Sequence, residues 1–272
     1  MAHHAFCESA TMLGLNRLSF GSAVAHWVVL ATLAFSAHVV AEPADAVAKV
    51  KSSVVAVGYF KETNSPRFLF RGTGFAVLDG NTLATNAHVV LSSQESDGAA
   101  LAITIRTGPN QSQTRRASVV DVDTTHDLAL LRFDGPALPA LSVRTAESAR
   151  EGQAVLFMGF PIGGALGFSA VTHRGIISSI TPVALPGPTA SQLDAKTIGR
   201  LREGSFDLFQ LDATAYPGNS GGPLFDADTG EVIGVINMVA LKNLKESSLI
   251  HPSGISYAIP ARFLVQLLNK HR

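Results

Sequence analysis

The sequence contains one cysteine, Cys7, and one tryptophan, Trp27, in 272 residues. A single cysteine excludes a disulfide framework and a thiolate metal site. If the N-terminal segment that holds Cys7 is removed, a cysteine nucleophile is excluded as well. The 21 lysines and arginines balance the 21 aspartates and glutamates, and they form no basic cluster of the kind that binds nucleic acid. We therefore expect a globular protein with no cofactor, no metal and no nucleic-acid partner.

The first apolar run of the chain spans residues 23–41 and follows Arg17. It ends with the small residues Val39-Val40-Ala41. A basic residue, an apolar stretch and small residues before the cleavage site describe a secretory signal. We expect cleavage after Ala41 and a periplasmic or secreted protein. The alternative is an uncleaved membrane anchor, with the rest facing outside the cytoplasm, since the run approaches the ~20 residues that span a bilayer.

Residues 42–272 contain many short runs of β-branched, aromatic and other apolar residues between turn signals. Asp79-Gly80-Asn81 is typical of a hairpin, and Pro136 and Pro139 interrupt the series. Helical periodicity is confined to Pro260–Lys270. We therefore predict an all-β protein in two halves, residues 42–140 and 141–272, closed by a helix. The predicted strands are 53–60, 68–70, 74–78, 82–85, 101–106, 117–122, 128–133, 154–158, 169–172, 175–180, 208–211, 222–225, 232–237 and 254–258.

The clearest chemical signal is a serine among glycines, Gly218-Asn219-Ser220-Gly221-Gly222. So many glycines are unfavourable in a strand unless the backbone needs unusual dihedrals or close approach. Gly218 can turn backbone N–H groups towards one point, and the later glycines leave room beside the Ser220 hydroxyl. This pattern suits a nucleophile with main-chain oxyanion donors. A glycine-rich turn with an incidental serine is the alternative.

A serine nucleophile needs a base and a group that orients the base. His88 follows a predicted strand, where a neutral imidazole can accept the Ser220 proton. Asp127 directly precedes an apolar strand, and a carboxylate there needs a partner. Asp121 and Asp123 are alternative orienters at alternating, exposed positions.

A metal site built from His126 with Asp121 and Asp123 is a weaker hypothesis, because no His-x-x-x-His or cysteine spacing accompanies them. Gly218-x-Ser220-x-Gly222 also matches the nucleophile elbow of α/β-hydrolases, with Asp226 and His251 following in that fold's order. That fold needs a helix after the elbow, whereas Pro223–Phe225 is strand-like.

His88, Asp127 and Ser220 occur in the order of chymotrypsin-like serine proteases. More narrowly, the chain resembles the HtrA/Deg family. The resemblance implies two six-stranded antiparallel β-barrels with the site between them, His88 and Asp127 from the first and Ser220 from the second. It further implies a serine endopeptidase that acts through an acyl-enzyme. The segments that carry the resemblance are Gly72-Thr-Gly-Phe75, Thr85-Asn-Ala-His-Val-Val90, His126-Asp-Leu-Ala-Leu-Leu131 and Gly218-Asn-Ser-Gly-Gly-Pro-Leu224.

The resemblance also assigns further site residues. The oxyanion hole comprises Gly218, Asn219 and Ser220, in which the N–H groups of Gly218 and Ser220 are the donors and Asn219 shapes the turn. In this fold the residue six positions before the serine, here Thr214, lies at the base of the primary pocket. Because Thr214 is not acidic, we expect cleavage of exported or misfolded polypeptides after small or medium aliphatic residues. The implied pocket wall is Ile236, Asn237 and Met238.

Members of the family commonly carry a PDZ domain after the protease. This chain stops at Arg272, shortly after the resembling region, so we expect a protease domain alone. Members often form trimers, so a homo-oligomer is a further expectation. The long connection Pro182–Asp207 is either a loop that regulates the site or a solvated insertion. The alternative to a peptidase is a catalytically silent binding or scaffold protein of the same fold.

Overall fold

The computed structural model describes residues 43–91, 98–108, 111–144, 149–164, 168–183, 206–238 and 254–272. These residues belong to a compact unit that begins at Ala41. The predicted signal or anchor segment, most of the Pro182–Asp207 connection, and His251 lie outside the described residues. Among the described residues, no helix is long and apolar enough to cross a membrane.

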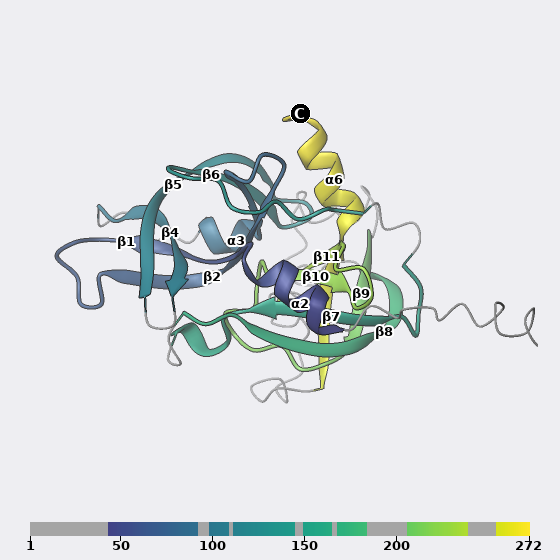
Figure 1. The fold of residues 1–272 in the computed structure, drawn as a ribbon. Coiled ribbons are helices and arrows are strands. Elements are labelled where there is room, and N and C mark those ends of the chain that lie inside the picture. The colour runs from purple at the N-terminus through teal and green to yellow at the C-terminus, as the bar shows by residue number, and fades with distance from the viewer. Residues whose placement is uncertain are drawn as a thin grey trace, which may run out of the picture. The chain divides into compact units, whose positions relative to one another are not determined.

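Six antiparallel strands form the first closed barrel, in the order β1-β2-β3-β6-β5-β4 (Figure 1, blue to teal). Helix α2 (Pro43–Lys51) precedes them. The predicted hairpin connects β2 to β3, where the Asp79 carboxylate accepts the N–H groups of Asn81 and Thr82 at 3.1 and 3.0 Å. The strands are β1 (Val54–Phe60), β2 (Phe68–Val77), β3 (Thr82–Thr85), β4 (Ala100–Gly108), β5 (Gln111–Asp123) and β6 (Leu128–Phe133).

The second closed barrel has the order β10-β11-β12-β9-β8-β7 (Figure 1). Its strands are β7 (Ala154–Gly159), β8 (Val171–Val183), β9 (Phe206–Asp212), β10 (Pro223–Asp226), β11 (Val232–Ile236) and β12 (Ile255–Pro260). The short helices are α3 (Ala87–Val90), η3 (Pro161–Gly164) and α6 (Ala261–Asn269). The prediction of two six-stranded antiparallel barrels with a short closing helix is therefore confirmed.

Strand β6 shows how the two barrels share a core. Its sequence is almost continuously apolar because both of its faces are buried. Leu128 and Leu130 belong to a large cluster that also contains Phe225 of the second barrel. Ala129 and Leu131 belong to the cluster inside the first barrel. The shared cluster therefore fixes β6, and the turn before it, against the second barrel.

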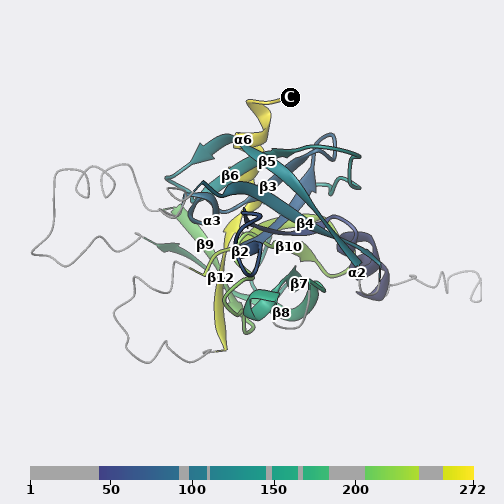
Figure 2. The ribbon, with the colours of Figure 1, turned by 90° about the vertical axis from the view of Figure 1, so that its left-hand side faces the viewer.

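Helix α6, at the top of Figure 2, packs against β11 and β12 of the second barrel, and the side chains of Phe263 and, just after the helix, His271 also contact the first barrel. The ring of Phe263 stacks on His126, with 3.9 Å between the ring centroids. Nε2 of His271 lies 2.9 Å from a carboxylate oxygen of Asp121. The predicted apolar face of the helix is buried, and its residues are Phe263, Leu264, Leu267 and Leu268.

Several strands are longer than the sequence predicts. Strand β2 runs unbroken from Phe68 to Val77, where the separate strands 68–70 and 74–78 were expected. Strand β5 begins at Gln111, whereas the sequence predicts a start at residue 117. The sequence does not reveal the first half of the strand because that half is polar, mostly exposed and without apolar alternation. Strand β8 runs unbroken through Gly175, where two separate strands were expected. A Cβ at Gly175 would lie 2.5 Å from the carbonyl oxygen of Asp212, so this glycine permits close approach of β9 and does not end a strand.

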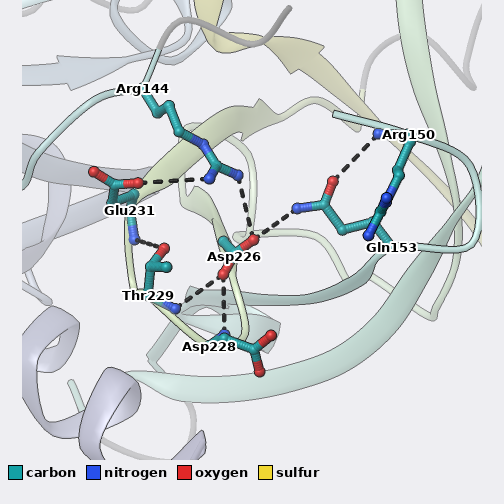
Figure 3. A network of polar contacts seen from close by, with 7 residues as sticks. All are labelled: Arg144, Arg150, Gln153, Asp226, Asp228, Thr229 and Glu231. Carbon is teal, nitrogen blue, oxygen red and sulfur yellow. Dashed lines mark hydrogen bonds and ion pairs between the residues drawn. The ribbon is translucent and has the colours of Figure 1, made fainter. Parts of the chain in front are cut away.

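A polar network joins the linker between the barrels to the turn from β10 to β11 (Figure 3). Oδ1 of Asp226 accepts the N–H groups of Asp228 and Thr229 at 3.0 and 2.9 Å. Oδ2 accepts Nε2 of Gln153 at 2.7 Å and Nη2 of Arg144 at 3.2 Å. Burial acts to raise the pKa of Asp226, but the hydrogen bonds from Thr229, Asp228 and Gln153 together outweigh it and lower the pKa below 3.8. The network therefore holds a charged carboxylate at neutral pH.

Candidate active site

Strand pairing brings His88 and Asp127 together. Strand β3 ends at Thr85, which pairs with Ala129 at the start of β6. The residues that follow β3 therefore lie beside those that precede β6. His88 is in the short helix α3 directly after β3, and Asp127 is the residue before β6.

Asp127 is fixed through both its main chain and its side chain. Its φ of +53° lies in the left-handed region, which favours glycine but is also adopted by aspartate. Its carbonyl accepts the N–H of Ala87 at 3.1 Å and Nδ2 of Asn86 at 2.9 Å. The carboxylate then meets His88 twice: Oδ1 accepts its main-chain N–H at 2.8 Å, and Oδ2 lies 2.6 Å from its Nδ1.

This pairing determines the chemistry of the His88 ring. Because an ionised carboxylate only accepts hydrogen bonds, Nδ1 carries the proton that faces Asp127. In the neutral ring Nε2 then keeps its lone pair and can accept a proton. The other candidate orienters have different partners: Asp123 lies 2.7 Å from Nδ1 of His126, and Asp121 contacts His271.

Asn237 reaches the same carboxylate from the second barrel. Its Nδ2 donates to Oδ2 of Asp127 at 2.9 Å, across 110 positions of sequence. Asn237 also belongs to the predicted wall of the specificity pocket, and its carboxamide points to Asp127. The hydrogen bond fixes the orientation of the Asp127 carboxylate towards His88.

Ser220 is 6% exposed and lies in the segment Gly218–Ser220, here called the oxyanion turn. Gly218 has a φ of +103°, and a Cβ there would lie 2.2 Å from the carbonyl oxygen of Phe160. Gly221 has a φ of +84° and is similarly crowded by the carbonyl of Thr73. Both positions therefore require glycine.

Thr73 of β2 holds the oxyanion turn. Its N–H donates to the carbonyl of Ser220 at 2.8 Å, and its Oγ1 donates to the carbonyl of Gly218 at 2.7 Å. The N–H of Asn219 donates to the carbonyl of Tyr216 at 3.0 Å, so it belongs to the turn. Within the described part of the chain, the N–H groups of Gly218 and Ser220 donate to no acceptor. They are thus available to a developing oxyanion.

The serine hydroxyl has one hydrogen-bond partner among the residues that the structure describes. Oγ of Ser220 accepts the N–H of Met238 at 3.3 Å, and among the described residues no hydrogen bond joins it to His88. Ile236 of the predicted pocket wall is fully buried, and its main chain pairs with Gly221 and Gly222. Met238 is thus the residue of the predicted pocket wall that contacts the Ser220 hydroxyl.

Thr214 is half-buried, between two residues that Ser256 ties together. Oγ of Ser256 donates to the carbonyl of Ala213 and accepts the N–H of Ala215, both at 2.7 Å. Sequence reasoning missed Thr73 and Ser256. The threonine enclosed by glycines in Gly72-Thr73-Gly74 was an available signal for the first, whereas nothing local marks Ser256.

Residues 72–235, more than half of the chain, match the family model of the trypsin-like peptidase domain. The chain therefore belongs to the trypsin-like peptidase family, a class of serine-type endopeptidases. Its resemblance within that class to the HtrA family is confirmed. It is 32% identical to serine protease HTRA1B of Danio rerio over 228 residues, which cover 83% of this chain and 40% of HTRA1B.

Serine protease HTRA3 of Rattus norvegicus is 33% identical over 239 residues, which cover 84% of this chain and 45% of HTRA3. A solved structure of an HtrA-type protease, AlgW with a tripeptide, matches with a TM-score of 0.57 and 26% identity, over 84% of this chain and 62% of that one. The chain thus spans less than half the length of these curated relatives.

Proposed function

We propose that this chain is a serine endopeptidase in which Ser220 is the nucleophile, His88 the general base and Asp127 the orienter. The observation that carries the proposal is the double contact of Asp127 with His88, at 2.8 Å to the main-chain N–H and 2.6 Å to Nδ1. It leaves Nε2 as the proton acceptor. The glycine-rich turn supplies the nucleophile and two N–H donors that have no acceptor in the described part of the chain.

The reaction begins when the Ser220 hydroxyl turns from the N–H of Met238 to Nε2 of His88. His88 takes the proton as Oγ attacks the scissile carbonyl. The N–H groups of Gly218 and Ser220 bind the oxyanion of the tetrahedral intermediate. Collapse of this intermediate forms the acyl-enzyme, while His88 protonates the leaving amine. A water activated by His88 then hydrolyses the ester.

The substrates we propose are exported or misfolded polypeptides with a small or medium aliphatic residue before the cleaved bond. Thr214, which is uncharged and held between residues that bond to Ser256, supports this preference. A peptide library digested with the purified protein tests it. Cleavage mainly after arginine or lysine would contradict the proposed pocket. A periplasmic or secreted location rests on the N-terminal segment alone.

Labelling with a fluorophosphonate probe tests the nucleophile. The wild type is expected to label and to cleave casein, and Ser220→Ala is expected to do neither. Ser118→Ala, which alters an exposed serine on β5, is the matched control and retains both. Labelling or casein cleavage by Ser220→Ala would overturn the assignment.

One observation favours the alternative of a catalytically silent binding or scaffold protein: Ser220 bonds to Met238 and not to His88. The same experiment separates the two functions. A folded wild type that neither labels nor cleaves casein would support the silent protein.

A further inference from the structure

His173 lies beside the oxyanion turn and takes no part in the mechanism proposed above. It is opposite Phe157 in the pairing of β8 with β7. The two rings stack with 4.7 Å between centroids and 12° between planes. This stacking fixes the plane of the imidazole. Nε2 of the ring lies 3.4 Å from Nδ2 of Asn219, the middle residue of the oxyanion turn.

The Asn219 side chain has few ways to satisfy its polar atoms. It is fully buried, and within the described part of the chain its Oδ1 has no hydrogen-bond partner. A Cβ at Gly159 would lie 2.7 Å from that Oδ1, so the surrounding space is tight. The contact with His173 is therefore the polar contact that orients the carboxamide. Without this contact both polar atoms of the buried amide would lack a hydrogen bond, which favours a different side-chain conformation.

The protonation state of the His173 ring is consistent with this hydrogen bond. Burial lowers the pKa of His173, which favours the neutral ring at neutral pH. With Nδ2 of Asn219 facing it, Nε2 accepts and the proton is on Nδ1. If the carboxamide turned over, Oδ1 would accept a hydrogen from Nε2 in the other tautomer. In both arrangements His173 is the partner of the carboxamide.

We propose that His173 is a positioning residue for the oxyanion turn, because it holds the Asn219 carboxamide and thereby fixes the main chain between Gly218 and Ser220. The proposal rests on the proposed function, since it concerns the same oxyanion site. Thr73 holds the carbonyls of Gly218 and Ser220 from one side, and His173 holds the Asn219 side chain between them. A small displacement of an oxyanion donor weakens binding of the transition state more than binding of the substrate.

The test separates the hydrogen bond from the packing. His173→Phe keeps an aromatic ring against Phe157 but removes Nε2, whereas His173→Gln supplies an amide close to the position of Nε2. We expect His173→Phe to lower the maximal rate of Ser220 phosphonylation by a fluorophosphonate about tenfold, with half-saturation changed less than about twofold. His173→Gln is expected to stay within about threefold of the wild type. His271→Phe, at a histidine that contacts Asp121, is the matched control and leaves the rate unchanged.

A double-mutant cycle identifies the carboxamide as the link. Asn219→Ala is expected to lower the phosphonylation rate about tenfold by itself, and His173→Phe is expected to add less than about twofold in that background. Independent losses that multiply would overturn the proposal. An equal loss in His173→Phe and His173→Gln would also overturn it, because it would assign only a packing role.

If His173→Phe does not fold, His173→Gln and Asn219→Ala test the proposal. A tenfold loss in His173→Gln, or no loss in Asn219→Ala, contradicts the proposal. The two proposals fail in different ways: labelling of Ser220→Ala refutes the proposed nucleophile, whereas wild-type rates in folded His173→Phe refute only the role of His173.

Discussion

Replacing Asp226 by asparagine removes the charge at the centre of the network in Figure 3. The asparagine Oδ1 can still accept the N–H groups of Asp228 and Thr229. The new NH₂ group, however, faces the donors of Gln153 and Arg144. In the wild type these donors lie 2.7 and 3.2 Å from Oδ2 of Asp226. Two hydrogen bonds to a charged acceptor are lost, each contributing about 1.5 to 3 kcal/mol when buried.

Part of this loss is recovered, since the Arg144 side chain is 28% exposed and also contacts Glu231 at 3.6 Å. We therefore expect Asp226→Asn to lower the free energy of unfolding by about 2 to 4 kcal/mol at neutral pH. Urea denaturation followed by circular dichroism measures the change. A loss below about 0.5 kcal/mol would refute the reasoning, because a surface substitution alone gives that much.

The pH dependence has a definite sign. The pKa of Asp226 is lowered on folding, so its charge contributes stability above the ordinary value of 3.8. That contribution is lost as the pH falls through the ordinary pKa towards the lower pKa of the folded state. The gap between wild type and Asp226→Asn should thus be constant near neutrality and shrink below about pH 4.

Asp79→Asn is the matched control. Asp79 also forms an ion pair, with Arg132 at 2.9 Å, but the two side chains are 48% and 57% exposed. Exposed pairs contribute less than about 1 kcal/mol, so this variant should change stability much less. Equal losses in the two variants would show that burial of the network is not the cause.

Three further substitutions test contacts of the site. Thr73→Val removes the hydroxyl that donates to Gly218 and accepts the N–H of Phe160; it should lower kcat at least about tenfold with little change in KM, measured with a peptide ester. Asn237→Ala removes one hydrogen bond from Asp127 and should lower kcat/KM about tenfold, corresponding to about 1.4 kcal/mol, in the same assay. Ser256→Ala leaves the N–H of Ala215 and the carbonyl of Ala213 without their partner; it should lower the free energy of unfolding by about 1 to 3 kcal/mol in urea and raise KM.

Local signals in the sequence predict much of the fold. Apolar runs mark most strands, and the turn residues Asp79-Gly80-Asn81 mark the β2–β3 hairpin. The same signals identify His88 after one strand and Asp127 before another, and the pairing of β3 with β6 brings them together. The polar half of β5 shows where local signals fail to predict a strand, since this half depends on pairing with β4 and not on its own composition.

The remaining contacts of the site join residues that are far apart in the sequence, which local patterns do not encode. Thr73 meets Gly218 across 145 positions. The contact of the Asn237 carboxamide with Asp127 was not predicted, because resemblance gives a position along the chain and not the direction of a side chain. His173 lies in a strand of mixed polar and apolar residues, where its sequence neighbours give no sign of a stacked and half-buried ring.

The contacts that relate the proposed nucleophile, Ser220, to the proposed base, His88, cross between the barrels. Thr73 in the first barrel holds the carbonyls of Gly218 and Ser220 in the second. Asn237 after β11 holds the Asp127 carboxylate before β6. The cluster that contains Leu128, Leu130 and Phe225 keeps the same two regions together through apolar burial. Since each barrel closes on itself, a shift of one against the other would misalign the site without breaking a strand pair. The interface between the barrels is therefore part of the active-site geometry, and half of the chain taken alone does not define it.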